Sequence, residues 1–100
     1  MLILAEIALV GTNLPDADFW LIRVHDEKTV GQPTQTFKPE YIGIKVERTD
    51  LLLPQFAYYL MMYLWQQGYW TERCHGTTNR KNIHVVDVQR IELQPYGGAK

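Results

Sequence analysis

Hydrophobic and polar positions predict strands in three segments of the chain. The clearest is 41–48, where three aliphatic side chains face one way and Gly43 and Lys45 face the other, as a half-buried strand requires. Residues 18–25 carry aromatic and β-branched side chains after a turn signal, which predicts a second strand. Residues 90–95 alternate again and predict a final strand.

Three further segments are ambiguous from their pattern alone. Residues 2–10 are apolar apart from Glu6, which predicts a strand over most of the segment, with one helical turn running into a strand as the alternative. Residues 29–39 contain β-forming side chains interrupted by glycine and proline, so an exposed loop or an edge strand is expected. Residues 83–89 fit either a short strand or a single turn of helix.

Residues 54–67 form the longest apolar segment with helical features. Pro54 suits the first turn, where its missing N–H has no partner to lose, and Gly68 suits the position after the last turn. Apolar side chains occupy nearly the whole circumference, which is typical of a buried helix. No charged residue occurs in 51–70, but proline and glutamines shorten the apolar stretch below the length of a membrane span. Residues 69–74 predict one further turn.

Composition places these elements in a single domain. The chain has 100 residues, of which 46% are hydrophobic, enough for one core and too few for two. We expect an α/β (α+β) domain over residues 1–96, with a twisted mixed or antiparallel sheet of about five strands packed by the 54–67 helix. Residues 97–100 predict a frayed tail. The single cysteine, Cys74, cannot form an internal disulfide, which fits the cytoplasm.

Charge is near balance overall but uneven along the chain. The net charge of −1 excludes a uniformly basic protein of the histone-like or polybasic membrane-binding kind. Within 73–90, however, only Asp87 is acidic, and the basic residues are Arg73, Arg80, Lys81 and Arg90. This segment includes a polar loop, 75–82, whose hydroxyl, amide and backbone groups are able to reach phosphates or base edges. The alternative is a solvated loop whose polar side chains cap its own turns.

Catalytic and metal-binding patterns are weak. Cys74 and His75 are adjacent, but neighbouring residues rarely present their side chains to one another, and no third orienting group is evident. A zinc site built from Cys74, His75, His84 and His25 matches no standard ligand spacing. The sequence also lacks a Walker loop, a dinucleotide-binding glycine pattern and an HExxH motif. We therefore expect no enzymatic activity, no cofactor and no metal site.

Aromatic residues are concentrated in and just after the predicted helix. Seven of the twelve fall between positions 56 and 70. Rings at helical spacing bury against a sheet first, and the remaining tyrosine and tryptophan side chains then mark association surfaces. Core packing and a protein interface are therefore favoured over base stacking.

Three motifs follow one another in the second half of the chain. They are Leu53-Pro54-Gln55-Phe56-Ala57-Tyr58-Tyr59-Leu60, then Gly76-Thr77-Thr78-Asn79-Arg80-Lys81-Asn82-Ile83, then Val86-Asp87-Val88-Gln89-Arg90-Ile91-Glu92-Leu93-Gln94-Pro95. Their order and spacing resemble the closing half of the target-recognition domains in type I restriction-modification specificity subunits. The resemblance covers residues 41–95, with weaker similarity at 4–8 and 19–32.

The resemblance implies a non-catalytic module that binds double-stranded DNA. Family domains are longer, usually paired, and joined by helices that dock methyltransferase subunits, so this chain resembles a minimal, stand-alone version. Arg80 and Lys81 would hold phosphates, while Asn79 and two threonines would approach base edges. The full set of implied DNA contacts is Thr77, Thr78, Asn79, Arg80, Lys81, Gln32, Thr34 and Gln35.

A protein-interaction module is the alternative function. The aromatic helix would then make the chain a homodimer or bind a methyltransferase-type subunit of a modification complex, without any contact to DNA. The expected contact residues are Tyr58, Met62 and Trp65.

Overall fold

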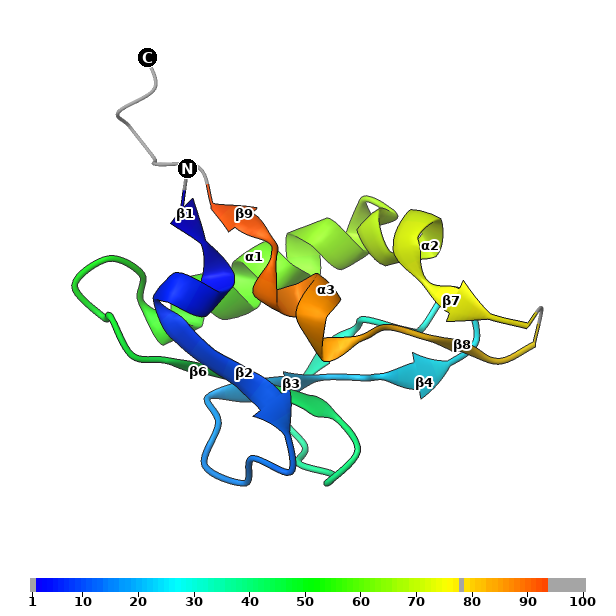
Figure 1. The fold of residues 1–100 in the computed structure, drawn as a ribbon, viewed down its shortest axis with the longest axis horizontal. Coiled ribbons are helices and arrows are strands. Elements are labelled where there is room, and N and C mark those ends of the chain that lie inside the picture. The colour runs from blue at the N-terminus through cyan, green and yellow to red at the C-terminus, as the bar shows by residue number, and fades with distance from the viewer. Residues whose placement is uncertain (1, 78, 94–100) are drawn as a thin grey trace, which may run out of the picture.

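Three antiparallel sheets and three α-helices make up the described part of the computed structural model, residues 2–77 and 79–93 (Figure 1). The chain is thus a mixed α+β domain, as predicted. The strands are β1 (Leu2–Ile3), β2 (Ala8–Thr12), β3 (Phe19–Leu21), β4 (Val24–His25), β5 (Pro33–Thr34), β6 (Ile42–Val46), β7 (His75–Gly76), β8 (Lys81–Asn82) and β9 (Glu92–Leu93). The helices are α1 (Pro54–Gln66), α2 (Tyr69–Arg73) and α3 (Val85–Gln89), with a 3-10 turn, η1 (Leu4–Glu6).

The central sheet has four strands in the order β2-β6-β3-β5. The predicted strand at 18–25 is divided, because the chain changes partner at its middle. Ile22 still exchanges hydrogen bonds with the two residues just before β5: its N–H donates to the Gln32 carbonyl at 3.1 Å, and its carbonyl accepts from the Gly31 N–H at 2.8 Å. The Arg23 carbonyl instead accepts from the Ile83 N–H at 3.0 Å. β3 therefore belongs to the central sheet, and β4 belongs to a second sheet of order β4-β8-β7.

β6 has the predicted alternation, with one exception. Ile42, Ile44 and Val46 are buried and Lys45 is exposed, as expected, but Gly43 is buried too. The 12–18 loop folds over Gly43, where an added Cβ would lie 2.9 Å from the Cβ of Ala17. Only a glycine leaves room for this loop on the second face of the sheet.

α1 has the predicted position but not the predicted burial. Ala57 and Met61 are fully buried against the sheet, and burying a side chain such as Met61 contributes about 1.5–3 kcal/mol. Phe56, Tyr59 and Tyr63 are instead 42%, 56% and 57% exposed. The expectation of a buried helix is therefore wrong for this face, whose aromatic side chains remain largely open to solvent.

The ambiguous segments divide between their alternatives. The 2–10 segment contains η1 between two strands, and Ile3 N–H donates to the Glu6 carboxylate at 2.8 Å across that turn. Within 29–39, β5 is the expected edge strand. The 83–89 segment takes the helical alternative from Val85 onward, and the final predicted strand is confirmed at β9, whose partner is β1. The prediction is wrong for residues 90 and 91, which end α3 and lead into β9, while residues 94–95 and the 97–100 tail lie outside the described residues.

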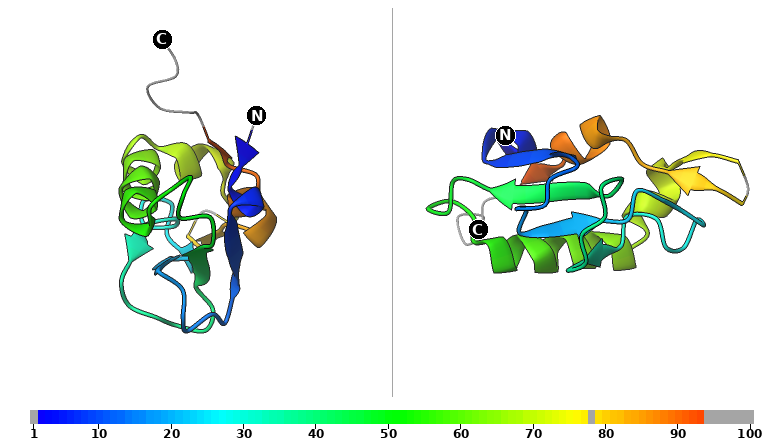
Figure 2. Two further views of the ribbon diagram at one scale, coloured as in Figure 1. Left: turned by 90° about the vertical axis from the view of Figure 1, so that its left-hand side faces the viewer. Right: turned by 90° about the horizontal axis from the view of Figure 1, so that it is seen from below.

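The helices pack on different parts of the central sheet. α1 contacts β5 and β6, whereas α3 contacts β2 and η1, and Figure 2 shows the two helices on opposite sides of the molecule. Buried side chains of the central strands fill the space between them, and Phe19 meets Tyr58 of α1 edge-on at 5.3 Å between ring centroids. No helix in the described ranges has the length and apolar character needed to cross a membrane.

Candidate functional site

The predicted polar loop at 75–82 is a β-hairpin. β7 and β8 pair antiparallel, with His75 opposite Asn82 and Gly76 opposite Lys81, and β8 is also bonded to β4. The assignment of the whole segment to a loop is therefore wrong at both ends, since only 77–80 connects the strands. The hairpin projects at one end of the molecule (Figures 1 and 2).

Gly76 determines how the hairpin closes. Its φ of +113° lies in the region that favours glycine, and an added Cβ would lie 2.4 Å from the Arg80 carbonyl oxygen. The Arg80 N–H donates to the Thr77 carbonyl at 3.4 Å, which completes a tight turn. The glycine of the Gly-Thr-Thr-Asn segment therefore has a structural role that its sequence context alone did not specify.

The two adjacent cations of the hairpin have no carboxylate partner among the described residues. Arg80 is exposed, and Lys81 Nζ donates only to the Gly76 carbonyl, at 3.4 Å. By contrast, Arg48 lies 2.8 Å from the Asp50 carboxylate and Lys45 lies 3.7 Å from that of Asp18. Arg80 and Lys81 are therefore available to an external anion.

The polar residues beside these cations are open to solvent. Thr77 and Asn79 are both exposed on the connection between β7 and β8. Thr78, which the resemblance includes among the DNA contacts, lies outside the described residues.

The structure does not bring Thr34 and Gln35 to the hairpin. Thr34 lies in β5 opposite Trp20, and Gln35 lines a shallow concavity of about 380 Å³ together with Pro54 and Gln55 at the start of α1. The hairpin follows α2, beyond the other end of α1 (Figure 1). Thr34 and Gln35 therefore belong to a different part of the surface from Thr77, Asn79, Arg80 and Lys81. Gln32 lies just before β5, where its carbonyl accepts from the Ile22 N–H at 3.1 Å.

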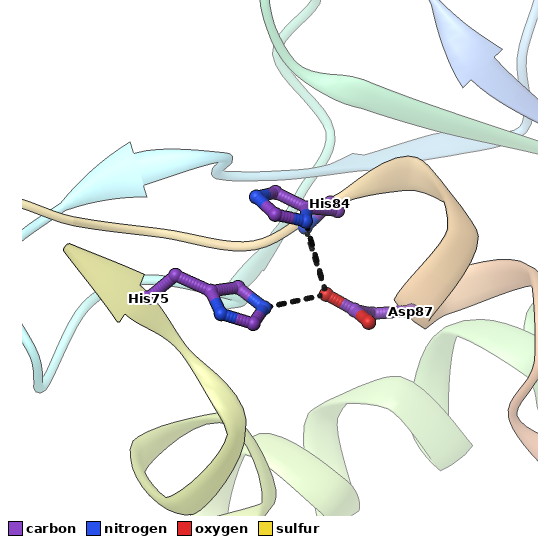
Figure 3. A group of neighbouring side chains, drawn as sticks. All are labelled: His75, His84 and Asp87. Atoms are coloured by element: carbon purple, nitrogen blue, oxygen red, sulfur yellow. Dashed lines mark hydrogen bonds and ion pairs between the residues drawn. The ribbon is translucent and has the colours of Figure 1, made fainter.

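Three ligand-type side chains meet at the base of the hairpin. His75 comes from β7, His84 lies just before α3, and Asp87 lies in the first turn of α3 (Figure 3). His75 Nε2 is 3.1 Å from Asp87 Oδ2, and His84 Nδ1 is 4.0 Å from the same oxygen. The two imidazole rings stack with centroids 4.2 Å apart and an interplanar angle of 12°. One ligand atom from each residue lies within 4.8 Å of the others.

Asp87 has a second task at this position. Its Oδ2 accepts a hydrogen bond from the His84 backbone N–H at 3.1 Å, which caps the start of α3. The carboxylate is therefore held in place by the helix that carries it, while the two histidine side chains are 48% and 50% exposed.

The residues of this cluster differ from the zinc ligands considered from the sequence, which were Cys74, His75, His84 and His25. Cys74 and His25 are not part of the cluster. The Cys74 Sγ lies 3.7 Å from the Thr71 carbonyl oxygen, and His25 Nδ1 accepts from the Asp26 N–H at 2.8 Å. Sequence reasoning missed Asp87 as a possible ligand, because this residue entered only the charge balance of residues 73–90. Its spacing of three residues from His84, next to a possible helical turn, was the available signal.

Side chains expected to form a helix interface have contacts within the chain. Tyr58 packs on Phe19, and Trp65 Nε1 donates to the Lys28 carbonyl at 2.9 Å. Met62, like these two residues, is half-buried. The exposed face of α1 is centred on Tyr59 and Tyr63 instead.

Two carboxyl groups have pKa values below their ordinary values. The pKa of Asp26 lies below its ordinary value because its carboxylate accepts hydrogen bonds from Thr29, and the Thr29 backbone N–H donates at 2.9 Å. Hydrogen bonds from Arg48 likewise lower the pKa of Asp50. Both groups serve local turns and neither belongs to the hairpin.

No family model, curated protein or solved structure matches this chain. Functional assignment therefore depends on the geometry of the described residues and on the sequence resemblance.

Proposed function

We propose that this chain is a non-catalytic DNA-binding module related to the target-recognition domains of type I specificity subunits. The observation that carries the proposal is the pair Arg80 and Lys81, which projects on a hairpin with no carboxylate partner in the described ranges. Double-stranded DNA in the cytoplasm is the proposed partner.

The shape of the hairpin fits this function. The connection between β7 and β8 projects from the end of the three-stranded β4-β8-β7 sheet, and the arginine and lysine beside it are able to reach the phosphates of a DNA backbone. Thr77 and Asn79 are exposed beside them and carry the hydroxyl and amide groups that contact base edges. The site supplies about two phosphate contacts, so binding is expected to be weak and sensitive to salt.

Replacing both cations tests the proposal. Wild-type affinity for a short duplex should fall about tenfold between 50 and 200 mM salt, as two phosphate contacts require. In the variant Arg80→Ala/Lys81→Ala, binding to every duplex should weaken, and the slope of log K against log salt should become shallower by about 1.8. Fluorescence anisotropy of a labelled duplex measures both quantities.

A matched variant separates a local contact from net charge. Lys38→Ala/Lys45→Ala removes the same two charges from another part of the surface, and it should keep the wild-type slope. Equal losses in the two variants, or no retention of DNA by the wild type even at low salt, would contradict the proposal.

The second candidate is a protein-interaction module. The observation that favours it is a group of exposed apolar side chains on α1 and just before it, which comprises Leu51, Leu53, Phe56, Tyr59 and Tyr63. Its proposed partners are a second copy of this chain or a methyltransferase-type subunit.

A further inference from the structure

We propose that His75, His84 and Asp87 form a binding site for a divalent transition-metal ion of the Zn²⁺ class. Imidazole nitrogen and carboxylate oxygen are ordinary ligands of such ions. The proposal is independent of DNA binding, because it concerns the base of the hairpin and not its tip.

The distances suit one ion shared by the three side chains. Metal–ligand bonds of 2.0–2.2 Å place two ligands of a tetrahedral Zn²⁺ about 3.3 Å apart. The His75–Asp87 and His84–Asp87 separations of 3.1 and 4.0 Å lie on either side of that value, and the widest separation in the cluster does not exceed 4.8 Å. Small rotations of two half-exposed imidazoles therefore bring the set together.

The directions of the ligand atoms agree with a shared ion. In Figure 3, Nε2 of His75 and Nδ1 of His84 both face the same carboxylate oxygen of Asp87. A bound ion replaces this direct contact by bonds to the two nitrogens and one carboxylate oxygen. The same oxygen, Oδ2, also accepts the His84 backbone N–H at 3.1 Å, and this hydrogen bond orients the carboxylate as surrounding hydrogen bonds do in metal sites. Solvent exposure of the histidines leaves a path for entry and room for a water as fourth ligand.

The fold gives the ion a defined mechanical effect. His75 precedes the hairpin connection and the other two ligands follow it, so the ion closes a loop between β7 and α3. Binding that occurs only in the folded state stabilises that state, and it should restrict the base of the hairpin most.

Isothermal titration of the tag-free full chain with Zn²⁺ at neutral pH tests the site. The expected result is one ion per chain, with affinity reduced about tenfold or more in His84→Ala and in Asp87→Asn. His25→Ala and Cys74→Ser are the matched controls, since they remove ligand-type side chains that lie outside the cluster, and both should bind as the wild type does. Amide spectra confirm that each variant is folded.

A second measurement locates the ion directly. The chain has three histidines, so the ring resonances of His75 and His84 should change together on addition of Zn²⁺ while those of His25 stay unchanged. Wild-type affinity in His84→Ala, an equal response of His25, or no saturable binding at millimolar Zn²⁺ would overturn the proposal.

Discussion

Gly31 and Trp70 constrain one another in the interior of the molecule. Gly31 has a φ of +88°, and a Cβ at this position would lie 2.0 Å from Cδ1 of the Trp70 ring. Trp70 is itself only 1% exposed and has nowhere to move without displacing other core side chains. The glycine is therefore required both by the backbone conformation and by the space available.

The variant Gly31→Ala should lower the free energy of unfolding by about 2–4 kcal/mol, through backbone strain and overpacking together. Gly68→Ala is the control, because Gly68 has a similar φ of +82° but nothing within 4 Å of its added Cβ. It should lose about 1 kcal/mol from strain alone. Urea denaturation measures both, and equal losses would show that the contact with Trp70 is unimportant.

Asp26 and Thr29 provide a residue-scale test of electrostatics. Because the folded state lowers the pKa of Asp26, this carboxyl stabilises the fold above its unfolded pKa, and the contribution is lost as the pH falls through the lower folded value. Thr29→Ala removes the largest cause of the shift, the side-chain hydrogen bond, and should raise the pKa of Asp26 toward its ordinary value. An NMR titration of the Asp26 carboxyl checks this, and an unchanged pKa would contradict the assignment.

At the scale of elements, α1 is held by a narrow buried face. Ala57 is fully buried where the helix approaches the sheet, so Ala57→Leu should destabilise the fold by about 1–3 kcal/mol through overpacking. Gln66→Leu places the same leucine side chain at an exposed position of α1, where nothing is overpacked, and should change stability by no more than about 0.5 kcal/mol. Thermal or urea denaturation of the two variants compares them, and a neutral Ala57→Leu would mean that the helix is loosely packed.

The elements that depend on local pattern were predictable, and those that depend on distant partners were not. α1 begins at Pro54 as expected, and β6 has its alternating burial. The division of β3 from β4 follows from pairing with β8, more than fifty residues later, which local pattern does not contain. The burial of Gly43 likewise depends on the path of a loop.

The candidate site shows the same division. Arg80 and Lys81 were identified from local charge, and their residue types suffice for that prediction. His75, His84 and Asp87 come together only because the β7–β8 hairpin brings the residues after it back beside His75. Residue spacing alone does not reveal this. The exposed side of α1 was also missed, because a helix that is apolar all round gives no periodic signal.

At the scale of the whole molecule, the exposed α1 face predicts self-association if the second candidate function is correct. Wild-type protein should then show an apparent mass that rises with concentration, while Tyr59→Ser/Tyr63→Ser should remain a monomer. Leu9→Ser, which changes an exposed apolar residue on β2, is the control and should behave as the wild type. Light scattering over a range of concentrations decides this, and a concentration-independent wild-type monomer would count against it.

The pairing of β1 with β9 has a practical consequence for how this domain can be attached to others. Leu2 lies opposite Leu93, so both ends of the described chain leave from neighbouring points, away from the β7–β8 hairpin (Figure 1). Domains with adjacent ends tolerate insertion into a host protein or circular permutation. A fluorescent reporter or a surface tether joined at either end would therefore leave the hairpin unobstructed.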